Sequence, residues 1–498
     1  MKNLERFEGV NYYSAIKQEN TLKKLIEHSL FTQIRSYLDI TIAFSIMYDS
    51  ESQELTSILT KHRRKPKSAC FLVTITVLSA FCNGVFLNIR GPCVKDLATR
   101  ANISSSQMGW FFIASGLGGV VAALPAGKLI DYLQNPMTTL CSGLIIRAIT
   151  CFALPFVTTW YSLMIVGLLQ GITLPIVGVS LRAAILWTYG KRATPYLNLV
   201  MAAFGGGSMI APLMYDWFAV VTTSSAPLDY TFWGLAGFSL LLAGATLCVD
   251  RKRFVTPKKN SLLANQNEPG LLPGEDENEN EDGILPIEPT LSQTWMFWSF
   301  LLCYMAVSVG IEGILGSWIY TLAGGNKVTG FSTATWVNTA LWGSFTVTRL
   351  ILVIVSKRVK EATILQVSHL IMLCGLITAY CTFKLTPGGG SEGVTYPTWS
   401  LWMLTISFGI GIAPSFPNVM GLAQKLYPWK FSGTVQSLFG VAANAGNGAL
   451  PGLAGLLTNM PGIGGLAFVY VPLIGVVLMQ VLLMLLHCWR PLLAKIDG

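Results

Sequence analysis

The sequence contains little charge. Asp, Glu, Lys and Arg make up 12% of its 498 residues, about half the share found in an average soluble domain. Hydrophobic residues make up 52%, and the mean hydropathy is +0.54. Such a composition excludes an ordinary soluble globular protein. It predicts an all-α polytopic membrane protein with the lipid bilayer as its main partner.

Motifs of enzymes and metal proteins are also missing. The ten cysteines form no CxxC pair and no alternating Cys/His cluster, so neither a metal site nor a disulfide framework is predicted. The four histidines are scattered, and the chain has no phosphate-binding glycine loop and no nucleophile–base motif. We therefore expect neither an enzyme nor an ATP-driven pump, and no cofactor. The net charge of +9 lies mainly in basic loops, which indicates membrane orientation and not nucleic-acid binding.

Long apolar segments are present instead. About twelve are long enough to cross a bilayer as helices of about 20 residues. Their approximate ranges are 69–90, 107–127, 137–157, 161–187, 196–219, 230–249, 294–322, 332–355, 362–382, 399–420, 433–457 and 465–487. Basic clusters precede the first segment and follow even-numbered ones. Because basic loops stay in the cytoplasm, this pattern predicts that both termini are cytoplasmic.

One glycosylation motif agrees with this topology. Asn102-Ile103-Ser104 is the chain's only N-x-[ST] sequon, and it falls in the first loop, which the topology places outside. Asn102 is therefore a candidate glycosylation site. Such a sequon also arises readily by chance, so the agreement supports the topology only mildly.

Polar segments divide the chain into parts. Residues 1–68 are polar to moderately amphipathic and predict a cytoplasmic extension. Residues 250–293 contain a dense acidic run with few aromatics, which is typical of a flexible cytoplasmic linker. The linker separates two groups of six spans, 69–249 and 294–488, and a short cytoplasmic tail, 489–498, follows.

The two groups of spans echo each other. Gly207 lies five residues before Pro212 in the fifth span, and Gly446 lies five residues before Pro451 in the eleventh. Glycine-rich, proline-containing helices at matching places are typical of secondary carriers built from internal repeats. Glycine and proline are also frequent in membrane helices generally, so both interpretations stay open.

Several motifs resemble a known family. Gly127 and Asp131 in "GKLIDYL" resemble a loop signature of the major facilitator superfamily, although Tyr132 stands where arginine is usual. Other matching stretches are "GPCVKDL" (91–97), "LLQGI" (168–172), "YGKRATPYLNLVMAAFGGGSMIAPL" (189–213), "VGIEGILGSWIYTLA" (309–323), "WGSFTVTRL" (342–350) and "GIAPSFPNVMGLA" (411–423). Together they resemble the fucose permease-like branch, which includes the animal sodium-dependent glucose transporter and its orphan relatives.

The resemblance implies a fold and a function. The fold is twelve transmembrane helices in two six-helix bundles, and the function is alternating-access transport of a small polar solute, a hexose-like sugar, coupled to sodium or protons or facilitative. A plasma-membrane location follows. Two departures weaken the sugar assignment: Gly178 stands where relatives usually have an acid, and Arg182 where they usually have Asn. An organic-anion carrier of the same fold and a non-transporting receptor or scaffold remain alternatives.

Glu312 is the main candidate site residue. Inserting a carboxylate into a membrane span costs about 2.5 to 3.5 kcal/mol of free energy on insertion scales, so a functional or structural role is expected for it. Helical spacing places it on a small, polar stripe with Ser308 and Gly316, and the resemblance implies that it faces the central cavity. It would bind a sugar hydroxyl or a coupling cation, or form a structural ion pair with Arg147 or Arg349.

Arg147 lies near the middle of the third span and needs a partner there. We predict an acidic residue or several carbonyls beside it, with Glu312 the favoured acid, and we expect Arg182 to reach the cytoplasmic surface. Sugars are bound by amides and aromatic rings. The candidates for these contacts are Asn83, Gln170, Asn338, Trp318 and Trp342, although buried amides also join helices and tryptophans also anchor interfaces.

Overall fold

The computed structural model describes residues 66–189, 194–222, 227–249, 291–324, 327–328, 331–355, 359–386, 396–426 and 433–494. The predictions for residues 1–65 and for 250–290 lie outside these ranges. Helices of the first half are α2 (Pro66–Asn88), α3 (Arg90–Arg100), α4 (Met108–Leu133), α5 (Pro136–Ala153), α6 (Trp160–Tyr189), α7 (Thr194–Val221) and α8 (Pro227–Leu247). Helices of the second half are α10 (Leu291–Ala323), α11 (Thr333–Val355), α12 (Glu361–Leu385), α13 (Thr398–Ile412), α14 (Ser415–Leu426), α15 (Gly433–Leu457) and α16 (Ala467–Ala494).

Each of the twelve predicted spans corresponds to a helix or to consecutive helices. Ten described spans are long and apolar enough to cross a membrane. α11 and α15 are not among these ten; they carry Asn338 and Arg349, and Asn444 and Asn447, respectively. These two helices pack against α7 and α4 of the first half, where polar groups face protein and not lipid. The prediction of an all-α polytopic membrane protein is confirmed.

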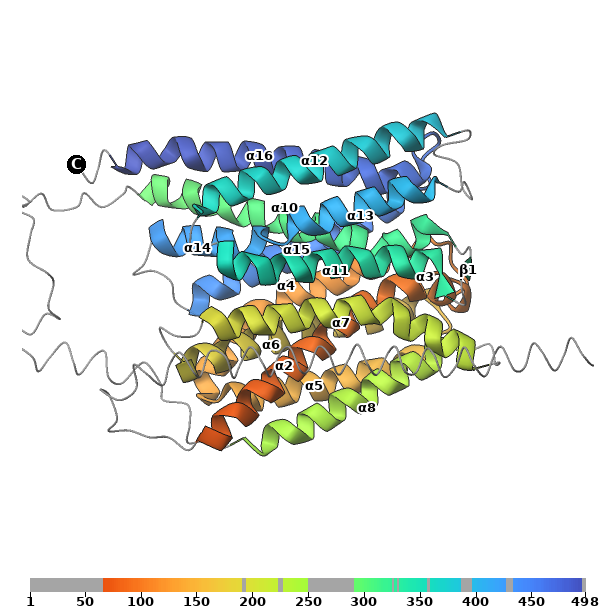
Figure 1. The fold of residues 1–498 in the computed structure, drawn as a ribbon. Helices are drawn as coiled ribbons and strands as arrows, with labels where there is room; N and C mark the ends of the chain where they lie inside the picture. The colour runs from red at the N-terminus through yellow and green to blue at the C-terminus, as the bar shows by residue number, and fades with distance from the viewer. Residues whose placement is uncertain are drawn as a thin grey trace, which may run out of the picture. The chain divides into compact units, whose positions relative to one another are not determined.

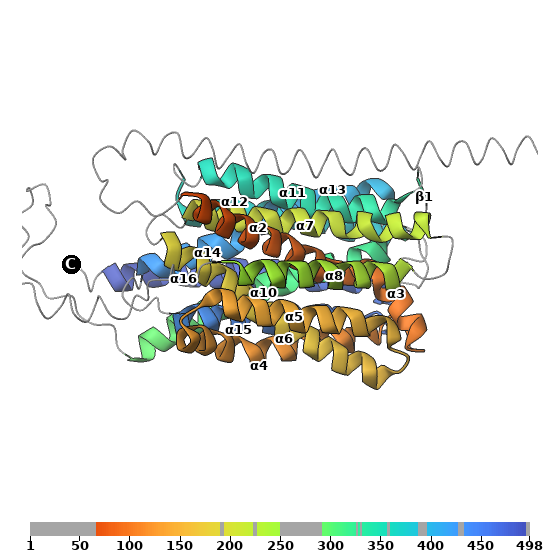
Figure 2. The same cartoon turned by 90° about the horizontal axis from the view of Figure 1, so that it is seen from below.

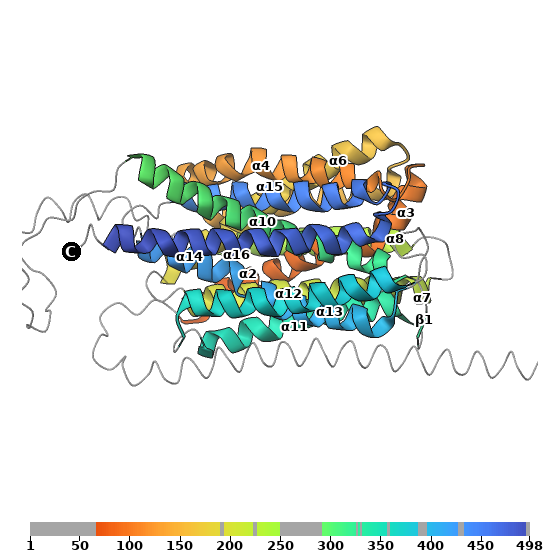
Figure 3. The same ribbon diagram turned by 90° about the horizontal axis from the view of Figure 1, so that it is seen from above.

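Helices of the two halves meet along the middle of the unit formed by residues 70–498. Figure 1 shows the first-half helices, coloured orange to yellow-green, below those of the second half. α4 packs on α15, α7 on α11 and α3 on α10. Figure 2 shows the α7–α11 pair, and Figure 3 shows the α4–α15 pair. The boundary between the halves is therefore formed by helices from both.

The signature residues Gly127 and Asp131 lie near the C-terminal end of α4, just before its short connection to α5. Gln134, with φ of 53°, is in the left-handed conformation and ends α4. Asn135 then caps α5, because its side-chain oxygen accepts a hydrogen bond from Met137 N at 3.0 Å. Gly127 is buried and Asp131 is exposed. The helix–turn–helix geometry thus leaves the Asp131 carboxylate at the surface.

A short hairpin connects α10 to α11. It consists of two strands of two residues each, β1 (Lys327–Val328) and β2 (Phe331–Ser332). Its strands pair antiparallel, with Lys327 opposite Ser332. The hairpin and α3 lie at the same end of the helices in Figure 1, and α14 lies toward the other end. We call these the hairpin end and the α14 end.

The repeated glycines have equivalent roles in the two halves. A side chain on Gly207 would strike the main chain of Phe81 on α2, and one on Gly446 would strike the main chain of Ala306 on α10. The fifth span therefore packs closely on the first, as the eleventh does on the seventh. This equivalence favours an internal repeat over a chance match.

We expect Gly446→Ala to lower the free energy of unfolding by about 1 to 3 kcal/mol, because two main chains would have to separate. Gly237→Ala on α8 is the matched control, since no heavy atom lies within 4 Å of the added carbon. Thermal unfolding of the two purified variants checks this. Equal melting temperatures would contradict the close packing at Gly446.

Candidate functional site

A cavity of about 190 Å³ lies between the two halves. This is many times the roughly 10 to 15 Å³ that a single water requires. First-half helices α2, α6 and α7 line it together with second-half helices α10, α11, α14 and α15. Its lining includes three charged side chains, Arg182, Glu312 and Arg349, and three amides, Asn83, Asn444 and Asn447. The site can thus hold a small solute in contact with both halves.

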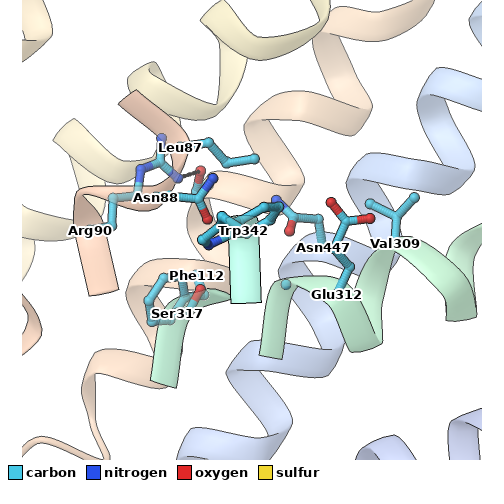
Figure 4. Close-up of a pocket in the computed structure, with 11 residues that line it drawn as sticks. Leu87, Asn88, Arg90, Phe112, Val309, Glu312, Ser317, Trp342 and Asn447 are labelled. Carbon is cyan, nitrogen blue, oxygen red and sulfur yellow. Dashed lines mark hydrogen bonds between the residues drawn. The ribbon is translucent and has the colours of Figure 1, made fainter. Parts of the chain in front are cut away.

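A second cavity of about 30 Å³ shares Glu312 and Asn447 with the first. It adds Asn88, Arg90 and Trp342 to the polar lining. Figure 4 shows Glu312 and Asn447 to one side of the Trp342 indole, and Asn88 and Arg90 to the other. Glu312 therefore lies where the two cavities meet.

The Glu312 carboxylate is not part of a hydrogen-bonded ion pair. The side chain is half-buried, and none of its atoms forms a hydrogen bond with a described residue. Arg349 is the cation that acts on it electrostatically. Arg100 and Asp229, by contrast, form a close ion pair at 2.5 Å. The structural ion pair considered from the sequence is therefore not formed, and the carboxylate is available to a ligand.

Arg147 has different partners from those predicted. It is fully buried, its Nη2 donates to Asn83 Oδ1 at 2.7 Å, and its guanidinium lies 4.3 Å from the centre of the Phe86 ring. The prediction that an acidic residue or several carbonyls would lie beside Arg147 is wrong. The side-chain amide of Asn83 and the face of the Phe86 ring are its partners instead. Glu312 does not contact it. Arg147 therefore holds a cavity-lining amide, Asn83, and is not itself a lining residue.

Two predicted sugar-binding amides lie away from both cavities. Gln170 on α6 and Asn338 on α11 are fully buried. Neither lines either of these two cavities, and their side-chain amide atoms have no hydrogen-bond partner among the described residues. Their place in the sequence motifs did not reveal which side of the helix they occupy. The structure therefore does not bring these two residues to the site.

The two predicted tryptophans differ in role. Trp318 is buried, donates from Nε1 to Pro451 O at 2.9 Å, and stacks on Phe468. Its contacts are those of a packing residue and not of a substrate-binding ring. Trp342 lines the smaller cavity, and its Nε1 has no hydrogen-bond partner in the part of the chain that the structure describes. Trp342 is thus the tryptophan placed to contact a ligand.

Arg90 was not predicted. Its Nη1 donates to Ser115 Oγ at 2.8 Å, and its guanidinium lies 4.8 Å from the centre of the Phe86 ring. It lines the smaller cavity. The signal was present, since a cation stood at the very end of the first apolar segment.

Arg182 lines the larger cavity, where the sequence predicted that it would reach the cytoplasmic surface. It forms no hydrogen bond or ion pair with any residue that the structure describes. Its Nη1 lies 3.6 Å from the point where a side-chain carbon on Gly178 would stand. The absence of a side chain at Gly178 therefore leaves room beside this guanidinium.

Asp216 joins the two halves at the hairpin end, a role that was not predicted. It lies on α7, and its carboxylate accepts hydrogen bonds from Tyr320 Oη at 2.7 Å and Ser332 N at 2.9 Å. The hydroxyls of Ser332 and Thr335 also donate to it. These donors come from α10, β2 and α11. One first-half carboxylate thus binds three second-half segments.

Asn102 follows α3 and is exposed, with a φ of 53°. Its side chain is accessible at the hairpin end. Glycosylation at this position stays a prediction.

Comparison with known proteins identifies the family to which this fold belongs. The model of the Major Facilitator Superfamily matches residues 76–451. The chain belongs to the Major Facilitator Superfamily. It is accordingly an integral multi-pass membrane protein and a transporter of small solutes.

Curated relatives are distant in sequence but similar in extent. The chain is 22% identical to human (Homo sapiens) sodium-dependent glucose transporter 1 over 389 residues, covering 75% of this chain and 71% of that protein. It is 20% identical to mouse (Mus musculus) major facilitator superfamily domain-containing protein 4A over 499 residues, covering 85% and 93%. The resemblance seen in the motifs is confirmed.

Solved structures show the same fold. The crystal structure of a D-xylose–proton symporter matches with a TM-score of 0.59 and 11% identity, covering 82% of this chain and 97% of that one. A mutant of the nucleoside transporter NupG matches with a TM-score of 0.58 and 15% identity, covering 84% and 99%. At such identities the likeness extends to the fold alone.

Proposed function

We propose that this protein moves a hexose-like sugar across a membrane by alternating access. The observation that carries the proposal is the cavity between the halves, in which the Glu312 carboxylate has no hydrogen bond to any described residue. Carboxylates and amides are the groups that bind sugar hydroxyls, and Asn444 and Asn447 line the same cavity. The names of the glucose and D-xylose carriers among the similar proteins support a sugar as solute.

Glu312 is also the proposed coupling site. A carboxylate inside a membrane protein binds a sodium ion or a proton when it has no fixed cationic partner. Arg349 lines the same cavity but lies beyond ion-pair distance of Glu312. A coupling cation and the sugar would then share the Glu312 region, so that loading of one favours loading of the other.

Uptake into vesicles tests the function. Purified full-length protein in liposomes should take up labelled glucose or fucose saturably, and an inward sodium or proton gradient should accelerate it. Protein-free liposomes are the control. Absence of uptake for every hexose tested, with correctly folded protein, would contradict the sugar assignment and favour a receptor or scaffold on a carrier fold.

The proposed orientation follows from the basic loops. We propose a plasma-membrane protein with the hairpin end outside and the α14 end in the cytoplasm. An epitope tag beside Asn102 should be reached by antibody in intact cells, whereas a tag within 258–283 should be reached only after permeabilisation. Both tags accessible from one side would contradict the arrangement. A shift in mass after glycosidase treatment, lost in Asn102→Gln, would identify the glycan.

A further inference from the structure

We propose that the transported solute carries a carboxylate and that Arg182 binds it. This inference rests on the proposed function, because it names the chemical class of the solute that the cavity takes. A sugar acid such as a hexuronate combines both: its hydroxyls suit the amides of the cavity, and its carboxylate suits the guanidinium.

The charges of the cavity carry the first step. Its described lining contains two guanidinium groups, Arg182 and Arg349, against one carboxylate, Glu312. One positive charge is therefore unbalanced inside a protein that lies in lipid, where an unpaired charge is costly. A neutral sugar leaves that charge unpaired. A solute with one carboxylate neutralises it.

The environment of Arg182 carries the second step. Arg349 lies over the Phe345 ring, 4.5 Å from its centre, and the Glu312 carboxylate acts on it electrostatically without forming an ion pair. Arg182 forms no hydrogen bond or ion pair with a described residue. A guanidinium presents donors that bind a carboxylate through two parallel hydrogen bonds. Arg182 is therefore the cation of the cavity best able to receive the anion.

Gly178 carries the third step. An added carbon there would lie 3.6 Å from Arg182 Nη1, which is ordinary contact distance. A carboxylate on a longer side chain at this position would thus stand beside the guanidinium and serve as its counter-ion. Glycine supplies no such group. The space and the charge are left for the solute.

Binding of three probes tests the proposal: D-glucuronate, D-glucose and L-lactate. Glucuronate and glucose share a ring and differ at one carbon, so their ratio isolates the carboxylate. We expect purified full-length protein to bind glucuronate at least about 10-fold more tightly than glucose, measured by calorimetry and by ligand-induced thermal stabilisation. Arg182→Gln should reduce the ratio to near one.

Gly178→Glu and Gly178→Gln are a matched pair that does not depend on removing Arg182. Their side chains have nearly the same size, so both take the same space from the ligands. Only the glutamate supplies a competing carboxylate beside Arg182. We expect the glucuronate preference to be lost in Gly178→Glu and kept in Gly178→Gln, whatever the change in overall affinity. The melting temperature without ligand shows that each variant is folded.

The outcomes separate the two proposals. Glucose bound as tightly as glucuronate overturns the carboxylate and leaves the hexose function in place. Lactate bound without either sugar upholds the carboxylate and overturns the hexose. Binding of none of the three overturns both. A glucuronate preference that survives in Gly178→Glu or in Arg182→Gln overturns the assignment to Arg182.

Discussion

Glu312→Gln should abolish most uptake while leaving the protein folded. The amide keeps the size of the side chain and removes its charge. Because the carboxylate forms no hydrogen bond or close ion pair with described residues, its loss should change the free energy of unfolding by less than about 1 kcal/mol. Uptake should fall about 10-fold or more, or lose its dependence on sodium or protons. Initial rates in liposomes, with and without each gradient, measure both effects.

Glu312→Asp is the control for this variant, since it keeps the charge and shortens the side chain. It should retain gradient dependence at a reduced rate. A structural role would give a different pattern, because leaving a buried cation uncompensated costs about 3 to 5 kcal/mol and would lower expression together with uptake. Normal uptake by Glu312→Gln with unchanged ion dependence would refute the functional role of this carboxylate.

The spans were predictable from sequence because lipid imposes a simple requirement on every helix that crosses it. α15 shows the limit of that signal, because Asn444 and Asn447 interrupt its apolar pattern where it packs on α4 of the other half. Helices α2, α6, α7 and α10 also line the larger cavity and are nevertheless apolar enough to cross a membrane. Hydropathy therefore finds spans, but it does not show which side of a helix faces the site.

Glu312 was predictable for a related reason. A charge in an apolar run stands out, whatever surrounds it. Gln170 and Asn338 could not be placed in the same way, because each helix has one side toward the cavity and another toward its neighbours, and both sides are buried. The partner of Arg147 was missed because Asn83 and Phe86 lie on a different span. Contacts between spans depend on helix rotation, which spacing along one helix does not determine.

Asp216 is the clearest case of a residue that the sequence could not assign. Its donors follow it by more than 100 residues and come from three separate segments. Only the folded arrangement brings them together, and they hold the first half to the second at the hairpin end. The larger cavity includes Phe416 on α14, whereas the smaller cavity includes Ser317, nearer the hairpin end. Separation of the halves at the hairpin end must therefore break the hydrogen bonds to Asp216.

We accordingly expect Asp216→Asn to open the hairpin end. The amide loses the charge that strengthens the hydrogen bonds from Tyr320 and Ser332, each worth about 1.5 to 3 kcal/mol to a charged group. Loss of even one such contribution shifts the balance between closed and open forms by roughly 10-fold or more. Ser317→Cys places a thiol beneath this end, in the smaller cavity. Its labelling by a membrane-impermeant maleimide, measured by mass mapping of that peptide, should accelerate by the same factor.

Asp229→Asn is the matched control, because it makes the same acid-to-amide change but acts within the first half. Asp229 on α8 pairs with Arg100 on α3 at 2.5 Å, and both residues belong to the first half. It should leave labelling at position 317 near the rate of the parent Ser317→Cys protein, even where it lowers the melting temperature. If both variants accelerated labelling at position 317 equally, the effect would come from a general loss of stability and not from the hydrogen bonds to Asp216. No acceleration by Asp216→Asn would mean that the helix contacts, and not this carboxylate, hold the hairpin end closed.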